Sequence, residues 1–462
     1  MKAKKATSKP LGDFEQKSTG VALIVHPVFP LPAKSDRFVP AVEDQIEEAT
    51  GLAHAIFLDV LDVVTVTINK PAPGYLIGKG NREKIGAMVE AEKPDLVIVN
   101  HNLSPVQQRN LERAWSVKVI DRTGLILEIF GERAQTKEGK IQVELAALEY
   151  QKSRLIRSWT HLERQRGGAG FMGGPGETQL EIDRRIIVDR IARLKKDLDH
   201  VRRNRELQKR SRAQVPFPIV ALVGYTNAGK STLFNVLTGA QVFAEDLPFA
   251  TLDPTMRKLA LPQGEEVILA DTVGFIADLP THLVAAFRST LEQVSYADII
   301  LHVRDISRPD HDMQKREVAL ILNDLGVDTD SDPRVIEVWN KIDALAGEDK
   351  DIVLSQARRQ EHDVVLVSAL QGEGVDSLCD MIQARLNRHK AVYRVIIPHH
   401  DGKALSWIHA KAQVINVDSD DMRQSALVLM DPALAGRFRQ AFPACECHAE
   451  EDDDYHYAGK GG

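Results

Sequence analysis

The feature that most constrains this chain is a segment at residues 224–231 that reads Gly-Tyr-Thr-Asn-Ala-Gly-Lys-Ser. An apolar run at 218–223 precedes it, and residues 232–237 have the spacing of the first turns of a helix. Between a strand and a helix, this Gly-x-x-x-x-Gly-Lys-Ser pattern directs backbone N–H groups at phosphate oxygens, and the helix N-terminus adds a partial positive charge. The segment therefore predicts a phosphate-binding loop in an α/β domain.

The side chains of this loop indicate how a nucleotide would be held. Lys230 would contact the β- and γ-phosphates, and the Ser231 hydroxyl would ligate Mg²⁺. The residues of this segment that we expect to contact the nucleotide are Gly224, Tyr225, Thr226, Asn227, Ala228, Gly229, Lys230, Ser231 and Thr232.

Two further segments would respond to the γ-phosphate. An apolar run ends in Asp-x-x-Gly at 271–274, where Asp271 would hold Mg²⁺ through water and the Gly274 N–H would contact the γ-phosphate. Residues 249–255, Phe-Ala-Thr-Leu-Asp-Pro-Thr, are typical of a switch segment. We expect Phe249 and Thr251 to line the nucleotide and favour Thr251 over Thr255 as the second Mg²⁺ ligand.

The choice of base comes from two later segments. Asn340-Lys341-Ile342-Asp343 follows an apolar run, and the Asp343 carboxylate can accept hydrogen bonds from both N–H donors on the Watson–Crick edge of guanine. Adenine would leave that carboxylate partly unpaired. Ser368 and Ala369 end another apolar run, and the Ala369 N–H is expected at the guanine O6. The five segments together predict a site for GTP and GDP.

Catalysis is assigned to Lys230, Asp271 and Gly274. Ras-like enzymes place a Gln that orients the attacking water directly after Asp-x-x-Gly, but this chain has Phe275 there, which can neither donate nor accept a hydrogen bond. We therefore predict slow intrinsic hydrolysis that a partner stimulates.

The whole chain of 462 residues is too long for a single core and predicts an α/β multidomain protein. A P-loop GTPase domain with a mostly parallel sheet would be preceded by a small α/β domain and an antiparallel helical hairpin, and followed by a second small α/β domain. The expected divisions are a flexible N-terminus at 1–20, an N-terminal domain at 21–134, the hairpin at 135–213, the GTPase domain at 214–390, a C-terminal domain at 391–445 and an acidic tail at 446–462.

The hairpin carries the features expected of an RNA-binding arm. Residues 184–212 contain twelve Arg or Lys and four Asp or Glu, and six of the ten residues at 167–176 are glycine. The simpler explanations are a solvated helix face for the charged residues and a plain flexible connection for the glycines. However, an excess of positive charge along a helix suits contact with a phosphate-rich surface. The residues predicted to contact RNA are Arg164, Arg166, Gly168, Phe171, Met172, Arg184 and Arg185.

Two other segments leave alternatives open. Residues 74–81 have the glycine content of a second phosphate cradle at a helix start; a plain strand-to-helix turn is favoured over contact with a nucleotide or RNA. The tail sequence Cys445-Glu446-Cys447-His448 could bind a metal, but it lacks a second cluster.

Only three cysteines and no apolar run of about 18 residues occur, so we expect a cytoplasmic protein without a membrane span.

Four segments resemble the HflX family: residues 224–235, 249–255, 271–276 and the Gly-rich 173–181. The resemblance covers about residues 20–440. It implies a GTPase that binds the large (50S) ribosomal subunit and its rRNA, splits stalled or idle 70S ribosomes, and places the hairpin tip near the peptidyl-transferase centre. In related GTPases an Asn at the place of Asn227 helps to hold K⁺ against the phosphates.

The leading hypothesis is therefore a ribosome-stimulated GTP switch that acts as a monomer, with peripheral attachment to a membrane as an alternative to a purely cytoplasmic location. A second hypothesis is a GTP-gated RNA-binding or ribosome-assembly chaperone. A metabolic P-loop kinase is third, because residues 340–343 specify guanine and no acceptor-substrate motif is present.

Overall fold

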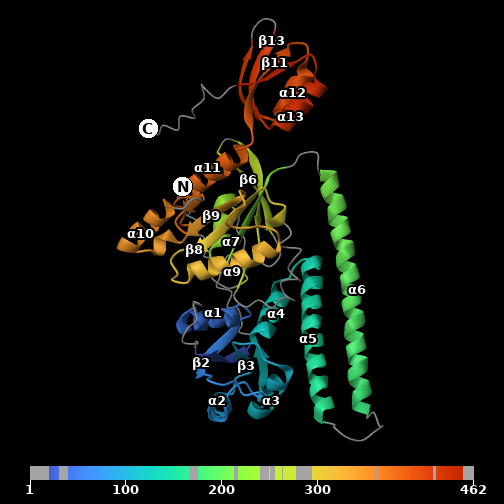
Figure 1. The fold of residues 1–462 in the computed structure, drawn as a ribbon, viewed down its shortest axis with the longest axis vertical. Helices are drawn as coiled ribbons and strands as arrows, with labels where there is room; N and C mark the ends of the chain where they lie inside the picture. The colour runs from blue at the N-terminus through green and yellow to red at the C-terminus, as the bar shows by residue number, and fades with distance from the viewer. Residues whose placement is uncertain are drawn as a thin grey trace, which may run out of the picture.

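The computed structural model describes residues 20–30, 40–165, 175–212, 217–239, 249, 255–262, 264–276, 294–359, 363–419 and 423–450. Three sheets follow one another along the long axis of the molecule, with the N-terminal and C-terminal sheets at opposite ends (Figure 1). Two long helices, α5 and α6, run beside the N-terminal and central sheets. None of the described helices combines the length and apolarity that crossing a membrane requires.

The N-terminal domain is a parallel four-stranded sheet in the order β2-β1-β3-β4, as the alternation of apolar runs and helices predicts. Strands β1 and β3 are buried on both faces, which explains their continuous apolar sequence. The elements are β1 (Gly20–Val28), α1 (Val42–His54), β2 (Leu58–Thr67), α2 (Lys79–Glu92), β3 (Leu96–Val99), α3 (Pro105–Trp115), β4 (Lys118–Asp121) and α4 (Arg122–Arg133).

The helical hairpin consists of α5 (Lys137–Gln165) and α6 (Pro175–Arg212). The predicted antiparallel hairpin is held by apolar side chains at helical spacing, because α6 packs on α5 through Ile141, Leu145, Ile191, Leu194 and Leu198. The side chains of Leu155, Trp159 and Leu162, which continue this spacing along the sequence of α5, lie outside the described part. The helices are therefore joined by a narrow seam of the kind found in coiled coils.

The central GTPase domain has a six-stranded sheet in the order β10-β9-β8-β5-β7-β6, in which β6 alone pairs antiparallel, with β7. The strand ends of β5, β7 and β9 carry the sequence motifs, so the motifs meet at one edge of the sheet. The elements are β5 (Ile219–Gly224), α7 (Lys230–Thr238), β6 (Thr255–Ala260), β7 (Glu266–Asp271), β8 (Ile299–Asp305), α9 (His311–Asp324), β9 (Val335–Asn340), η1 (Ile342–Ala344), α10 (Gly347–Ala357), β10 (Val364–Leu366) and α11 (Val375–Asn387).

The C-terminal domain has the β-α-β-β-α-β order and the antiparallel arrangement β12-β13-β11-β14 of ferredoxin-like domains. The sequence predicted only strand, helix, strand, helix for residues 391–442. The elements are β11 (Ala391–Pro398), α12 (Gly402–Lys411), β12 (Gln413–Ser419), β13 (Arg423–Met430), α13 (Pro432–Ala441) and β14 (Glu446–Ala449).

The last strand, β14, corrects the predicted start of the tail at residue 446, because Glu446–Ala449 belong to the C-terminal sheet. Cys447 lies opposite Val395 of β11, and Cys445 and Cys447 are both buried in the core of this domain. Burial of these two side chains in an apolar core explains the pairing and gives the cysteines a packing role. No group of three or more His, Cys, Asp or Glu able to hold a metal ion occurs in the part of the chain that the structure describes.

Candidate nucleotide site

The phosphate loop lies between β5 and α7, as predicted, and the close approach of neighbouring atoms explains its two glycines. A Cβ atom on Gly224, whose φ is +152°, would lie 2.2 Å from the carbonyl oxygen of Val303. A Cβ atom on Gly229, whose φ is +89°, would lie 2.2 Å from the Asn340 Nδ2 atom. Only glycine fits either position, so the loop is shaped to pass against β8 and the guanine motif.

The predicted phosphate and metal residues come together at the strand ends. Lys230 is 6% exposed, and its Nζ atom donates to the Tyr225 carbonyl oxygen at 2.7 Å. Burial lowers the pKa of Lys230 to about 8, against the opposing effect of the Asp271 carboxylate. The Ser231 hydroxyl donates to the Asp271 Oδ2 atom at 2.8 Å. A buried lysine beside this hydroxyl–carboxylate pair suits a phosphate chain with a bound cation.

The Asp-x-x-Gly segment lies directly on the phosphate loop. The Thr226 N–H donates to the Phe275 carbonyl oxygen at 2.6 Å, and the Phe275 N–H donates to the Gly224 carbonyl oxygen at 3.1 Å. A Cβ atom on Gly274 would lie 2.8 Å from the Thr226 Cγ2 atom and 3.1 Å from the Lys230 Nζ atom. Gly274 therefore lies at the predicted γ-phosphate end of the site, in contact with the loop.

The guanine end of the site is also assembled. Asn340 is 1% exposed, donates to the Ala228 carbonyl oxygen at 2.8 Å and accepts from the Ala369 N–H at 3.0 Å. Lys341 pairs with Asp305 at 2.9 Å. The Asp343 Oδ1 atom is buried and has no hydrogen-bond partner among the described residues. The buried Asp343 Oδ1 atom can therefore accept a hydrogen bond from the N–H donors of guanine.

Other predicted residues of the site are placed less completely. Ser368 is fully buried beside Ala369, and Thr232 lies in the first turn of α7. Asn227 is exposed with a φ of +62°, a left-handed conformation that Asn tolerates well. Thr251 lies outside the described residues, while Thr255 begins β6. The preference for Thr251 as a metal ligand therefore stays a prediction.

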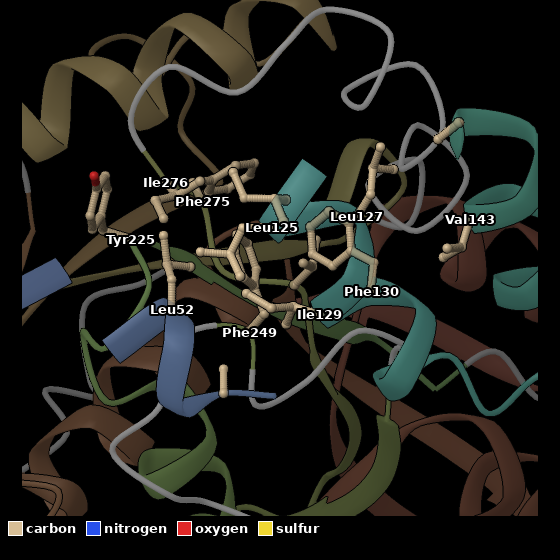
Figure 2. Packing of buried hydrophobic residues seen from close by; sticks show 14 of the residues in the cluster. Leu52, Leu125, Leu127, Ile129, Phe130, Val143, Tyr225, Phe249, Phe275 and Ile276 are labelled. Atoms are coloured by element: carbon tan, nitrogen blue, oxygen red, sulfur yellow. The ribbon is translucent and has the colours of Figure 1, made fainter. Parts of the chain in front are cut away.

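The sequence missed that the N-terminal domain packs against the nucleotide site. Phe249 of the switch segment stacks edge-on against Phe130 of α4, with ring centroids 4.7 Å apart. Phe275 is 2% exposed and belongs to a core cluster shared by the two domains (Figure 2). The Tyr225 hydroxyl donates to Glu48 of α1 at 3.3 Å. These contacts join residues far apart in the chain, so no local pattern could have predicted them.

Of the predicted RNA contacts, the structure describes the side chains of Arg184 and Arg185, and both are exposed. Arg166, Gly168, Phe171 and Met172 lie outside the described residues, as does the side chain of Arg164. Two basic residues of the arm are already paired with α5, because Arg190 contacts Glu144 at 2.7 Å and Lys195 contacts Glu149 at 2.9 Å. Part of the basic excess therefore joins the two helices to each other.

The segment at 74–81 contains the favoured strand-to-helix turn. Gly78 precedes α2 without a side-chain cap, and the Arg82 guanidinium lies 3.9 Å from the centre of the Tyr75 ring. Leu76 and Ile77 are buried, so the turn is anchored in the core of the N-terminal domain. Contact of this segment with a nucleotide or RNA stays an untested alternative.

Family models match the chain over most of its length. The model described as GTP-binding GTPase N-terminal matches residues 43–131, and GTP-binding GTPase Middle Region matches 133–212. The model described as 50S ribosome-binding GTPase matches residues 219–341, and the HflX C-terminal domain matches 353–437.

Two relatives with high sequence identity agree with these matches. The GTPase HflX of Magnetococcus marinus is 48% identical over 399 residues, which is 86% of this chain and 91% of that protein. The GTPase HflX of Escherichia coli is 43% identical and covers 79% of this chain and 84% of that protein. A GTP-binding protein from Sulfolobus solfataricus, solved in complex with GDP, has a TM-score of 0.44 at 24% identity and covers 80% of this chain and 99% of that one. The chain belongs to the HflX family of GTPases.

Proposed function

We propose that this GTPase binds the 50S ribosomal subunit and dissociates stalled or idle 70S ribosomes while GTP is bound, and that hydrolysis releases it. The observation that carries the proposal is the exposed surface of α6 near the hairpin tip. Arg184 and Arg185 are exposed there beside Ile182, which is 43% exposed, and Ile186, which is 60% exposed. Arginines among exposed apolar side chains suit a folded RNA with bound protein. The match to a 50S ribosome-binding GTPase model supports the same partner.

The remaining arm residues extend this surface in our proposal. Arg164, Arg166, Gly168, Phe171 and Met172 contact rRNA, with the arginines at phosphates and Phe171 stacked on a base. We propose that the glycines of residues 167–176 let the tip adapt to the partner, since glycine restricts the backbone least. The protein acts as a monomer in the cytoplasm; peripheral attachment to a membrane is the alternative location.

Two ions are part of the proposal. Ser231 and Asp271 would hold Mg²⁺ at the phosphates, with Thr251 as a further ligand, and Mg²⁺ would neutralise phosphate charge. The hydrogen bond of 2.8 Å between Ser231 and Asp271 brings the two oxygens to one place. Asn227 would help to hold K⁺. Equal hydrolysis rates in Na⁺ and K⁺ would remove the role of K⁺.

The test is a sucrose gradient of 70S ribosomes incubated with the full chain and a non-hydrolysable GTP analogue. We expect separate 30S and 50S peaks with the analogue and intact 70S with GDP. Replacing both Arg184 and Arg185 by Ala should reduce splitting about tenfold with GTP affinity unchanged, because fewer arginines at phosphates release fewer counterions on binding. Arg190→Ala, whose side chain pairs with Glu144, is the matched control. Intact 70S ribosomes in every lane would refute the splitting role.

Deletion of residues 165–176 separates this proposal from the RNA chaperone. Splitting activity should disappear while GTP binding and general RNA binding persist. A broad loss of RNA affinity without a specific loss of splitting would favour the chaperone.

The GTPase rate is a second measurement that tests the proposal, because the buried ring of Phe275 cannot orient the attacking water. We expect 50S subunits to raise the GTPase rate, and an unchanged rate would contradict a ribosome-stimulated switch.

A further inference from the structure

The guanine motif, residues 340–343, is joined to the end of the neighbouring strand β8. In the register of β8 and β9, Asp305 lies opposite Asn340. The Ile306 N–H donates to the Asn340 carbonyl oxygen at 3.1 Å, so the chain that leaves β8 stays beside the motif. The side chains of Ile306 and Ile342 are buried in one apolar cluster. The first and third residues of the motif are therefore both anchored to β8 or to the residue that follows it.

Lys341, the second residue of the motif, is restrained through its side chain. Its φ is +66°, in the left-handed region that a residue with a Cβ atom enters at an energetic cost. Its Nζ atom pairs with the Asp305 Oδ2 atom at 2.9 Å. The Asp305 side chain is 6% exposed and that of Lys341 is 29% exposed, so the pair is largely shielded from water. Shielding strengthens the attraction between the two charges and with it the restraint on Lys341.

Ser307 sets the orientation of the Asp305 carboxylate. The Asp305 Oδ1 atom accepts hydrogen bonds from the Ser307 N–H at 3.1 Å and from the Ser307 hydroxyl at 2.5 Å. The other oxygen, Oδ2, is the one that meets Lys341. Because each oxygen has its own partner, the carboxylate cannot rotate without breaking one of these contacts. The ammonium of Lys341 is therefore held at one defined place.

The position of Lys341 matters for the base because Asp343 follows two residues later. Lys341 directly precedes the short helix η1, and its carbonyl oxygen accepts a hydrogen bond from the Ala344 N–H at 3.0 Å. Asp343 is the middle residue of η1. Its buried Oδ1 atom, which has no hydrogen-bond partner in the described chain, is the predicted acceptor for guanine. A change in the backbone at Lys341 would therefore turn the carboxylate that recognises the base.

We propose that Asp305 is a positioning residue that strengthens the preference for guanine: it holds the ammonium of Lys341, and Lys341 in turn fixes the turn that carries Asp343. Ser307 supports this role by orienting the carboxylate. Asp305 acts through Lys341 and not by contact with the base. The role concerns the binding of GTP and GDP alone, so it is independent of the ribosome.

The test compares equilibrium affinities of the full chain for GDP and for inosine diphosphate, whose base lacks the 2-amino group of guanine. A carboxylate that accepts from both N–H donors of guanine finds only one of them on the inosine base. Asp305→Ala should weaken GDP binding about tenfold and inosine diphosphate binding about twofold, so the ratio of the two affinities falls about fivefold, as for one lost hydrogen bond. Asp305→Asn keeps one acceptor oxygen and should restore part of both losses.

A double-mutant cycle tests whether Asp305 acts through Lys341. Lys341→Met keeps the apolar stem of the side chain and removes the ammonium that Asp305 holds. Adding Asp305→Ala to the Lys341→Met protein should change GDP affinity by less than about twofold. Asp312→Ala is the matched control, because its carboxylate pairs at 2.6 Å with Arg304, the residue before Asp305, and is 71% exposed. It should change neither GDP affinity nor the ratio.

Three results would overturn the proposal. The first is wild-type GDP affinity in the Asp305→Ala protein. The second is a loss of affinity for both nucleotides in the same proportion, as expected of a residue that only stabilises the fold. The third is a cost of Asp305→Ala that is as large in the Lys341→Met protein as in wild type. If Asp305→Ala folds poorly, Ser307→Ala decides, since it leaves every charge in place: the ratio should fall about twofold, and a wild-type ratio would refute the role of Asp305.

Discussion

The N-terminal and GTPase sheets both gather polar side chains where their parallel strands end, but two carboxylates at these ends are hydrogen-bonded to different extents. At the end of β4, the Asp121 carboxylate accepts hydrogen bonds from two backbone N–H groups, from the Tyr150 hydroxyl and from Arg154. At the GTPase sheet, one Asp343 oxygen is buried with no partner in the part of the chain that the structure describes. Asp121 therefore serves its own domain, whereas the open oxygen of Asp343 can accept a hydrogen bond from a ligand.

Two helices of the N-terminal domain begin differently from the helix that follows the phosphate loop. In the N-terminal domain, α3 begins with a capping box between Ser104 and Gln107, and α4 begins with the Asp121 side chain bonded to the Gly124 N–H. In the GTPase domain, α7 begins at Lys230, and Gly229 at its N-cap position has no side chain to cap it. The N-terminus of α7 can therefore meet phosphate oxygens.

The largest predicted effect sharpens this comparison on the GTPase side. Lys230→Ala removes the cation at the phosphates and should weaken GTP and GDP binding on the order of 100- to 1000-fold, as the loss of a charge-assisted contact in a buried site would. Fluorescent-nucleotide titration measures the effect. A loss of less than about tenfold would mean that Lys230 is not the principal phosphate contact.

Asp121→Ala tests the N-terminal side. It leaves the Tyr150 hydroxyl and Arg154 without their buried acceptor, so we expect a loss of about 3 kcal/mol in the free energy of unfolding. Hydrogen exchange in β3 and β4 measures that loss. Nucleotide affinity should stay within about twofold of wild type, because the carboxylate serves its own domain; a large drop in affinity would break the comparison.

A pH-dependent effect is expected in the GTPase domain. His302 of β8 is 1% exposed, and burial lowers its pKa to about 3. Between about pH 6.5 and 3 the unfolded chain binds a proton here that the folded chain does not, so stability falls as pH falls, by at most about 1.4 kcal/mol per pH unit. Hydrogen exchange in β8 and β9, corrected for its intrinsic pH dependence, should show a shallower slope in His302→Gln. Identical slopes would show that His302 does not control acid stability.

The smallest predicted effect concerns the cap of α3. Ser104→Ala removes the side chain that accepts from the Gln107 N–H at 3.2 Å and should cost about 1 kcal/mol in the stability of the N-terminal domain. Urea unfolding followed by hydrogen exchange of α3 measures the loss. Nucleotide binding serves as the internal control and should not change.

The sequence predicted where the segments of the GTPase site lie, because each segment is local. The loop at 224–231, Asp271 with Gly274, and Asn340 with Asp343 each follow a buried strand, and parallel strands end at one edge of a sheet. The helical hairpin was predicted for a similar reason, since its apolar stripe repeats along the chain.

The rest depended on contacts between distant residues. Glu48 meets Tyr225, and Phe130 meets Phe249, across a domain boundary that leaves no periodic pattern. Strand β14 is only four residues long, and its single inward side chain, Cys447, gives no alternation to recognise. The pairing of Arg190 with Glu144 requires the register between two helices, which the sequence of either helix does not contain.

The buried ring of Phe275 limits how this enzyme could evolve or be engineered. A Gln at this position would supply the amide that orients water in Ras-like enzymes, but it would also place that amide in the pocket formed with the N-terminal domain. An unsatisfied amide there would cost about 1–3 kcal/mol. At this position Gln would favour faster hydrolysis without a partner, whereas Phe favours a closed domain interface. This sequence has Phe275, the residue that favours the interface.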